Sequence, residues 1–254
     1  MTFSRPTISV ICIVLNEEQN LPGLLAGLGW VDEVVVVDGG SRDGTRDIAR
    51  RFGASVHERP FDNFANQQNY ALSLARGDWI LSLDADERPT PEMIAEIRAR
   101  VHDPRFDAYR VRIRSSIFGR LVRFSGTQDD RQLRLVRRGH ARWQGEVHET
   151  LEATGPIGQL RCWLEHDPLP TLSVFLTKMH RYTTLAAQAR VERKCAPRFK
   201  DGWYSPAREV FRRLIWKQGI WDGPQGWAFC LLSGLSEWVL AHKHRRLWLE
   251  VSGR

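Results

Sequence analysis

The sequence predicts an α/β fold, in which helices cover a mostly parallel sheet and a helical extension follows. Four strand-like runs, three of them apolar, lie within the first 83 positions, and helix-like segments separate them. Apolar runs without polar alternation are typical of strands that are buried on both faces of a parallel sheet. From Pro170 onward, apolar residues recur at helical spacing instead. We therefore expect one α/β domain over residues 1–168 and a basic, Trp-rich helical extension over residues 169–254.

The first part of the chain alternates strands and helices. Asn16 is expected to cap the helix that follows the first strand, and Pro22 to lie near the start of that helix. Further helices are expected up to about Phe52, over residues 63–75 and over residues 91–102. This spacing is typical of right-handed βαβ units, which build a parallel sheet. Buried strands are expected at residues 7–15, 33–38 and 79–83, and a short strand at residues 54–58.

The pattern changes after residue 107. Residues 108–113 and 132–136 alternate apolar and polar side chains, as half-exposed strands do, and residues 159–165 form another candidate strand. Beyond Pro170 amphipathic helices are expected, one of which begins at Ser205–Pro206.

Charge is distributed unevenly along the chain. The net charge of +7 combines −5 over residues 1–100 with +12 over residues 101–254. The acidic part is suited to cations and the basic part to anionic partners. The four cysteines lie far apart without a CxxC pair, which fits a reducing compartment. Because no apolar stretch is long enough to cross a bilayer and no signal peptide is recognised, we expect a cytoplasmic protein.

Three carboxylates follow the fourth predicted strand. Asp84, Asp86 and Glu87 come directly after the buried run 79–83. Ligands bind outside the carboxyl ends of strands in open α/β sheets, and clustered acids repel one another unless a cation lies between them. Mg²⁺ or Mn²⁺ is the natural partner, because both take carboxylate oxygens and keep positions open for phosphate. The alternative is a solvated acidic helix start, which fits Glu87 and Glu92 but leaves the two aspartates unexplained.

Further polar residues are expected at the same edge of the sheet. Glu17 follows the first strand, Asp38 ends the second, and Asp84 and Asp86 follow the fourth. Carboxyl ends of parallel strands share one edge, so these side chains should lie close together. The loop from Asp38 to Thr45 leads into a helix, where backbone N–H groups favour anions. The set predicts a site for a nucleoside diphosphate, although no GxGxxG dinucleotide fingerprint follows the first strand.

Three segments together match a known family. ISVICIVLNEE, VVVVDGGSRDGT and ANQQNYALSLARGDWILSLDADE occur in this order, and over residues 7–150 the chain resembles the family 2 glycosyltransferases with the GT-A fold. The His-Glu pair and the basic tail with its aromatic segment at 219–223 are similar to those of lipopolysaccharide-core glucosyltransferases. The resemblance implies a Rossmann-like nucleotide-diphospho-sugar transferase domain over residues 1–168. It also implies metal-dependent, inverting transfer of a sugar, expected to be glucose, from a UDP-sugar to a lipopolysaccharide-core or other lipid-linked saccharide acceptor.

The resemblance also implies roles by motif position. Asp38 would contact uracil or ribose, Asp84 the ribose, and Asp86 the metal ion, Mg²⁺ or Mn²⁺. The nucleotide-side motifs also contain Asn16, Glu17, Asp43 and Gln68, the last at a position where many relatives carry Arg or Lys.

Inverting transfer needs a base on the face of the sugar opposite the leaving diphosphate, because the incoming hydroxyl must lose its proton. Glu146, His148 and Glu149 are the candidates. In relatives with this His-Glu pair the final acid matches the base position, which assigns the base to Glu149 and supporting roles to Glu146 and His148. The alternatives are an exposed strand-end acid for Glu149 and a hydrogen-bonded structural histidine for His148.

The extension interleaves aromatic and basic residues. Six Trp follow position 200, among Arg and Lys. Trp favours membrane–water interfaces, and basic side chains suit acidic headgroups. The apolar segment 227–240 is too short to span a bilayer. We expect peripheral contact with an anionic membrane, on the cytoplasmic face of the inner membrane. The alternative is that the Trp side chains pack the extension onto the first domain.

Other functions stay open at this point. A polyprenyl-phosphate sugar transferase would differ in its acceptor. A nucleotidyltransferase usually has a Gly- and Lys-rich N-terminal loop, yet residues 1–100 contain no Lys. The pI of about 9.6 would fit a nucleic-acid binder, but the first part is acidic and no nucleic-acid motif is present, so no nucleic-acid partner is expected.

Overall fold

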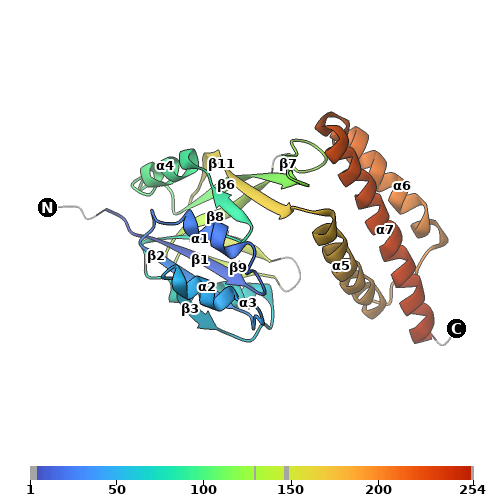
Figure 1. Cartoon of the computed structure of the whole chain (residues 1–254), viewed down its shortest axis with the longest axis horizontal. Coiled ribbons are helices and arrows are strands. Elements are labelled where there is room, and N and C mark those ends of the chain that lie inside the picture. The colour runs from blue at the N-terminus through green and yellow to red at the C-terminus, as the bar shows by residue number, and fades with distance from the viewer. Residues whose placement is uncertain (1–4, 129, 146–148, 253–254) are drawn as a thin grey trace. The chain divides into compact units, whose positions relative to one another are not determined.

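The computed structural model describes residues 5–128, 130–145 and 149–252 (Figure 1). The chain forms two compact units, one of residues 1–113 and 129–166 and the other of residues 114–128 and 167–254. Strands β6 (Ala108–Ile117) and β11 (Ile157–Leu169) run from the first unit into the second. A domain boundary after residue 168 stays a prediction, and the structure adds that segment 114–128 packs with the C-terminal helices.

The first unit is an α/β fold built on one mixed sheet, with strand order β3-β2-β1-β4-β8-β6-β11-β5. The four predicted strands are confirmed to within one residue and pair in parallel. The apolar sequences of the first, second and fourth strands suit burial on both faces, because helices cover the sheet, whereas the residues of the third are exposed or half-buried. The four strands are β1 (Ile8–Val14), β2 (Glu33–Asp38), β3 (Ser55–Glu58) and β4 (Trp79–Ser82).

Antiparallel pairs enter the sheet beyond β4. β8 (Arg131–Arg137) pairs with β4 and with β6, and β11 pairs with the three-residue strand β5 (Glu87–Pro89). The sequence did not indicate β5, because three residues carry no measurable periodicity. β9 (Ala141–Gln144) and β10 (Thr150–Ala153) form a separate two-stranded sheet.

Three helices join the parallel strands, α1 (Leu21–Ala26), α2 (Thr45–Arg51) and α3 (Phe64–Leu74), and α4 (Pro91–Arg100) follows β5. The side chain of Thr90 caps α4 by accepting a hydrogen bond from the backbone N–H of Met93. Pro22 lies in the first turn of α1, as predicted. The prediction that Asn16 caps α1 is wrong. Asn20 occupies the cap position, and Asn16 adopts a left-handed backbone with φ 56°, which lets its side chain bond to the neighbouring loop.

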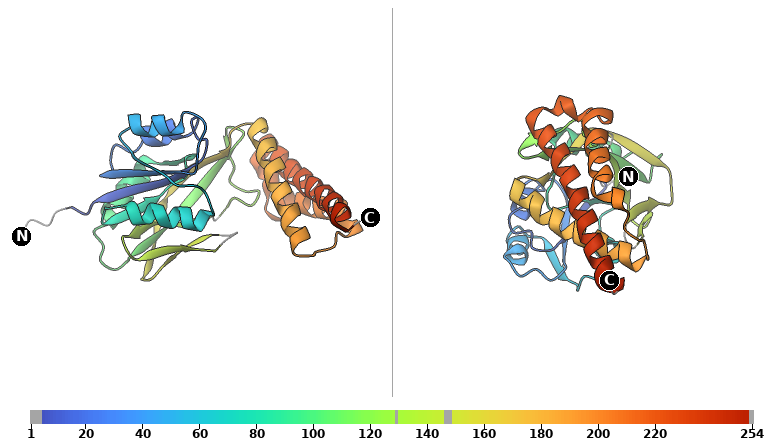
Figure 2. Two further views of the ribbon diagram at one scale, coloured as in Figure 1. Left: turned by 90° about the horizontal axis from the view of Figure 1, so that it is seen from below. Right: turned by 90° about the vertical axis from the view of Figure 1, so that its right-hand side faces the viewer.

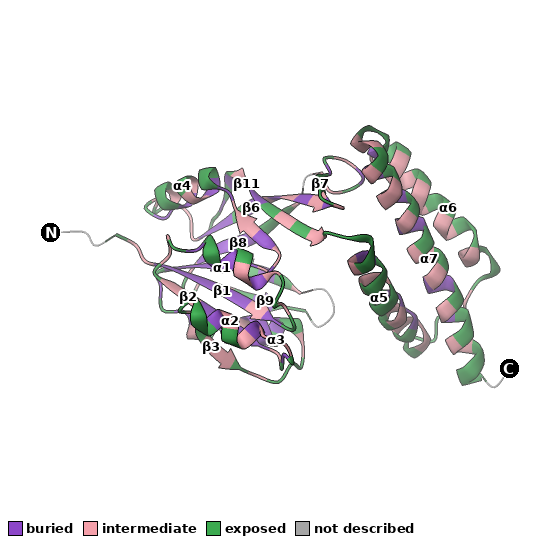
Figure 3. Ribbon diagram, in the orientation of Figure 1, coloured by how far each residue is buried: buried purple, intermediate pink, exposed green. Residues whose placement is uncertain are grey.

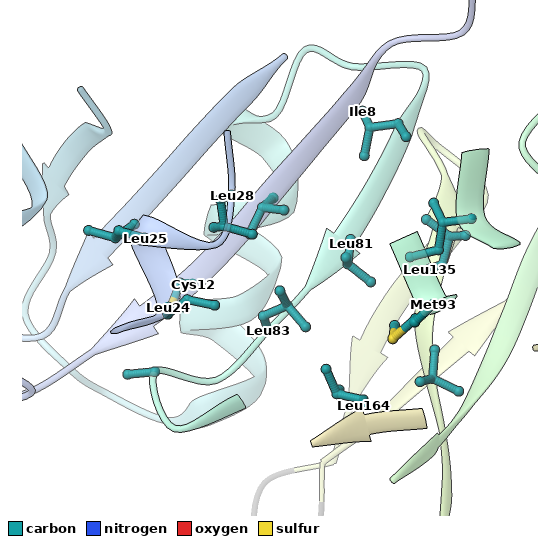
Figure 4. Packing of buried hydrophobic residues seen from close by; sticks show 14 of the residues in the cluster. Ile8, Cys12, Leu24, Leu25, Leu28, Leu81, Leu83, Met93, Leu135 and Leu164 are labelled. Atoms are coloured by element: carbon teal, nitrogen blue, oxygen red, sulfur yellow. The ribbon is translucent and has the colours of Figure 1, made fainter. Parts of the chain in front are cut away.

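The core holds the site-bearing strand ends together. Cys12, Leu81 and Leu83 pack against Leu24 of α1 and Met93 of α4 in one buried cluster (Figure 4). Full burial of an apolar side chain stabilises a fold by roughly 1.5–3 kcal/mol. These contacts therefore fix the carboxyl ends of β1 and β4 side by side, where the polar loops begin.

The second unit is helical. α7 (Gly223–Ser252) contacts both α5 (Leu172–Glu192) and α6 (Tyr204–Phe211), and the three helices lie side by side in Figure 2. A helix beginning near Ser205–Pro206 is thus confirmed. In the part of the chain that the structure describes, no helix combines the length and the apolar composition that crossing a membrane requires.

The aromatic segment at 219–223 has a structural role in this unit. The carboxylate of Asp222 accepts hydrogen bonds from the backbone N–H groups of Arg123 and Phe124 and from the hydroxyl of Ser125, at 2.7–3.2 Å. Hydrogen bonds to an ionised carboxylate are stronger than neutral ones. Asp222 therefore fastens segment 114–128 to the start of α7.

Candidate active site

Two loops at the carboxyl edge of the sheet are fastened to each other. The backbone N–H of Asn16 donates to the Ser41 hydroxyl, and the N–H of Arg42 donates to the Asn16 side-chain oxygen, each at 2.8 Å. The N–H of Glu17 donates to the Thr45 hydroxyl at 2.8 Å. Asn16 and Glu17 therefore link the loop after β1 to the loop after β2, and the two loops hold each other in place at this edge of the sheet.

Asp38 ends β2 and is fully buried. Its Oδ2 accepts hydrogen bonds from the backbone N–H groups of Gly40 and Ser41, both at 2.9 Å. Its Oδ1 has no hydrogen-bond partner within the described residues. Leaving a buried polar atom unpaired costs roughly 1–3 kcal/mol, so Oδ1 is an acceptor that a ligand donor would satisfy.

Asp43 and Gln68 are already engaged by the protein. Asp43 accepts hydrogen bonds from Thr45 and from the backbone N–H of Glu18. Burial opposes ionisation, but these hydrogen bonds outweigh it and lower the pKa of Asp43. Gln68 is buried on α3, where its side-chain oxygen accepts a hydrogen bond from the Ser82 hydroxyl at 3.4 Å.

A buried arginine organises the acids that follow β4. Nη2 of Arg134, on β8, lies 2.9 Å from Asp84 Oδ2 and 2.6 Å from Glu87 Oε1. Glu87 Oε2 also accepts the backbone N–H of Asp84 at 2.9 Å. Burial raises the pKa of Glu87 to about 7, and the charge of Arg134 opposes that shift. One cation thus faces two carboxylates, and Asp84 is held at the site by Arg134.

Asp86 has a different neighbour. Its Oδ1 lies 3.5 Å from Nε2 of His166, which β11 places opposite Glu87 in the strand register. Burial would lower the pKa of His166, but the hydrogen bond and charge of Asp86, with the charges of Glu87 and Asp84, raise it. The carboxylate oxygen of Asp86 is a ligand type that suits Mg²⁺ or Mn²⁺, and His166 offers an imidazole nitrogen, another common metal ligand, beside it.

The side chains that the structure describes do not by themselves complete a metal site. Among residues 5–128, 130–145 and 149–252, no group of three or more His, Cys, Asp or Glu side chains is arranged to hold a metal ion. A pair of protein ligands is nevertheless compatible with Mg²⁺, which usually keeps waters and substrate phosphates as its other ligands.

The predicted base lies in the segment between β9 and β10. Glu149 is half-buried and directly precedes β10, whereas Glu146 and His148 lie outside the described residues. The side-chain amide of Asn69 exchanges two hydrogen bonds, both at 2.9 Å, with the backbone of Trp143. These bonds fasten β9 to α3, so the strand that leads toward Glu149 has a fixed position.

Sequence reasoning missed His166, Arg134 and the burial of Glu87. His166 directly follows the predicted strand 159–165. Ligands bind at the carboxyl ends of strands, and this rule, which we used for the parallel strands, could also have indicated His166. Arg134 gave no signal, because a polar residue between two leucines in an alternating strand reads as solvent-exposed. In the structure only 4% of Arg134 is exposed.

Comparisons with known proteins show the family of this chain. Residues 9–154 match the family model "Glycosyl transferase family 2". The chain is 31% identical over 242 residues to the lipopolysaccharide core biosynthesis glycosyltransferase LpsC of Rhizobium meliloti, a match that covers 91% of this chain and 86% of that one. It is 35% identical over 105 residues to an undecaprenyl-phosphate 4-deoxy-4-formamido-L-arabinose transferase of Pseudomonas syringae, covering 35% and 31% of the two chains.

Among solved structures, the chain is similar to glucosyl-3-phosphoglycerate synthase of Mycobacterium tuberculosis in complex with Mn²⁺, UDP and glucosyl-3-phosphoglycerate. The identity is 25% and the TM-score 0.38, and the match covers 43% of this chain and 44% of that one.

Proposed function

Because the chain belongs to glycosyl transferase family 2 and has its GT-A fold, we propose that it transfers a sugar from a UDP-sugar donor to a saccharide of the lipopolysaccharide core. Glucose is the sugar that we propose. The proposal rests mainly on one observation. Asp38, Asp84 and Asp86 lie at the carboxyl ends of parallel strands, at one edge of the sheet, and His166 faces Asp86 there. Similarity to LpsC over most of both chains supports the acceptor class.

The donor nucleotide would lie along the loops after β1 and β2. The unpaired Oδ1 of Asp38 is suited to accept an N–H of the base, because it is buried and has no partner in the described chain. Asp84, held by Arg134, would accept a ribose hydroxyl. Asn16, Glu17 and Asp43 would act indirectly, because their bonds hold the two loops in position.

Asp86 and His166 would hold Mg²⁺ or Mn²⁺. When bound, the cation would neutralise charge on the leaving diphosphate. A neutral His166 is needed for ligation, so the raised pKa of this histidine predicts that donor binding weakens as the pH falls.

Glu149 would accept the proton of the attacking acceptor hydroxyl, as an inverting transfer requires on the face opposite the diphosphate. Glu149 is half-buried next to β10, and β9 is fastened to α3 through Asn69, which supports a defined position for this carboxylate.

Glu149→Gln is expected to leave donor binding nearly intact and to lower turnover by on the order of 10²-fold or more, because the amide keeps the shape and removes the basicity. Steady-state turnover and titration with a UDP-sugar, performed on the same preparation, measure both effects. Glu146→Gln and His148→Ala are the matched variants. Normal turnover by Glu149→Gln together with an inactive Glu146→Gln or His148→Ala would move the base to the other residue.

A polyprenyl phosphate is the second candidate acceptor. It is favoured by the similarity to the undecaprenyl-phosphate transferase, although that match covers only 35% of this chain. Comparing turnover with a lipopolysaccharide-core saccharide and with undecaprenyl phosphate separates the two acceptors.

Both acceptors are linked to lipids, and we propose that the second unit holds the enzyme on an anionic membrane, at its cytoplasmic face. Five of the six Trp after position 200 are exposed, as are large parts of the surface of α6 and α7 (Figure 3). Trp216 ends a π-helical segment (Arg212–Trp216) and Trp221 lies in a 3₁₀ helix (Gly219–Asp222), both between α6 and α7, and they are 78% and 75% exposed. Packing against the rest of the chain therefore does not account for them. Arg212 and Arg213 are ion-paired with Glu209. The proposed membrane contact therefore depends more on the exposed aromatic side chains than on these two cations.

Replacing Trp216 and Trp221 together with Ser is expected to weaken binding to anionic vesicles roughly tenfold or more, since each buried aromatic contributes about 1.5–3 kcal/mol. Flotation with vesicles that contain or lack an acidic phospholipid measures the effect. Phe52→Ser, which removes an aromatic residue 49% exposed in the first unit, is the matched control. Equal flotation of all variants, or equal recovery with neutral and acidic vesicles, would leave these residues without a membrane role.

A further inference from the structure

The first unit has a pocket of about 430 Å³ that is rich in arginine. It lies at β6, β8 and β11 and the end of α4, and the proposed transferase reaction does not use it. Its size is within the usual range for small-molecule sites. Five arginines line it: Arg100, Arg105, Arg112, Arg131 and Arg161.

The acids near the pocket neutralise only part of this charge. Asp103 pairs with Arg105 at 2.7 Å. Glu96 lies 3.6 Å from Arg100, and it also accepts the backbone N–H groups of Arg161 and Cys162. Within the described chain, the guanidinium groups of Arg112 and Arg161 have no acidic partner. The pocket therefore keeps an excess of positive charge.

Arg112 is held ready to bind an anion. Its guanidinium lies over the ring of Trp163, with 3.9 Å between the guanidinium carbon and the ring centroid. Stacking fixes the plane of the guanidinium and leaves its N–H edge available for a carboxylate or phosphate. Its Nε is buried and has no hydrogen-bond partner among the described residues, and an anion would supply one.

The pocket is separate from the candidate active site. Arg161 and His166 both belong to β11 but lie an odd number of positions apart, so their side chains point to opposite faces of the sheet. An anion at Arg112 and Arg161 would therefore not occupy the position of the donor diphosphate.

We propose that this pocket is a second binding site, which takes a saccharide through a phosphate or carboxylate group and so retains anionic acceptor molecules near the enzyme. The saccharide class rests on the proposed function. The exposed Gln159 in the lining would suit sugar hydroxyls, whereas the arginines would bind the anionic group. Retention of one part of an acceptor raises the local concentration of the remainder.

The test follows arginine side-chain N–H signals by NMR in the whole chain, with glucose 6-phosphate, glucuronate, neutral methyl glucoside and inorganic phosphate as probes. Saturable shifts are expected at Arg112 and Arg161 with at least one of the two anionic sugars, and none with methyl glucoside. Arg112→Gln combined with Arg161→Gln is expected to weaken that binding at least tenfold. Arg110→Gln, an exposed arginine of the same strand outside the lining, is expected to change it less than twofold.

Three outcomes would overturn the proposal: unchanged binding by the double variant, inorganic phosphate binding as tightly as the better anionic sugar, or a short RNA displacing the sugar at lower concentration. Binding of UDP-glucose with Mn²⁺ is measured on the same samples and is expected to be equal in wild type and double variant. Absent donor binding in the wild type contradicts the proposed function. Intact donor binding without an anionic-sugar response at Arg112 contradicts the second site alone.

Discussion

Asp86→Ala is expected to abolish sugar transfer and to remove the metal dependence of UDP-sugar binding, while the fold survives. Asp86 supplies the oxygen nearest to Nε2 of His166, and Arg134 already engages the carboxylates of Asp84 and Glu87. Neither of these two described acids is therefore left to replace it. Because the loss concerns the charge that develops on the leaving diphosphate, turnover is expected to fall by at least 10³-fold, on the order of 4 kcal/mol of barrier.

The experiment combines turnover, UDP-sugar titration with and without Mn²⁺, and thermal unfolding. Asp47→Ala, which removes an exposed acid on α2, is the matched control and should retain full activity. Unchanged turnover in Asp86→Ala, or full activity of the wild type in excess chelator, would refute the role of Asp86 in holding a metal.

Arg134→Met is expected to lower the free energy of unfolding by about 3–5 kcal/mol, the usual loss when one partner of a buried ion pair is removed. The substitution would leave the buried carboxylate of Glu87 beside Asp84 without the cation that faces both. Urea denaturation measures the loss. Arg134→Lys keeps the positive charge but not the planar set of guanidinium N–H donors, and its free energy of unfolding should fall by less. A loss below about 1 kcal/mol would mean that the acids are stabilised by other groups.

The same substitution should change the pH dependence of stability. The pKa of Glu87 is raised from 4.5 to about 7 in the folded protein, so the folded state binds more protons than the unfolded state between these values. Stability contributed by this group is thus present at low pH and falls as the pH rises through that window. Without Arg134 the pKa of Glu87 should rise further, so the defect of Arg134→Met should be largest above pH 7 and smaller near pH 5.

Much of the fold is predictable because its strands are buried on both faces. The runs 33–38 and 79–83 have no polar alternation, and this marks β2 and β4 with little ambiguity. Other features depend on tertiary contacts. β5 has three residues and exists through its pairing with β11, and the cap at Asn16 fails because a left-handed backbone directs that side chain to the neighbouring loop.

The candidate site is predictable to the extent that its residues follow parallel strands. Asp38, Asp84 and Asp86 are found this way, because the carboxyl ends of parallel strands share an edge. Arg134 belongs to β8, which runs antiparallel to β4, and His166 belongs to β11, whose place and direction in the sheet the sequence does not show. An alternating pattern also cannot distinguish an arginine facing water from one facing buried carboxylates.

The most direct test is thermal unfolding of the whole chain with a series of nucleotide sugars, with and without Mn²⁺ or Mg²⁺, followed by turnover of the nucleotide sugar that stabilises it. A UDP-sugar should raise the Tm only when the divalent cation is present, and the sugar should then pass to a lipopolysaccharide-core saccharide with inversion at its anomeric carbon. If no nucleotide sugar raises the Tm, or if the same rise occurs in excess chelator, the metal-dependent transferase function proposed for this edge is contradicted.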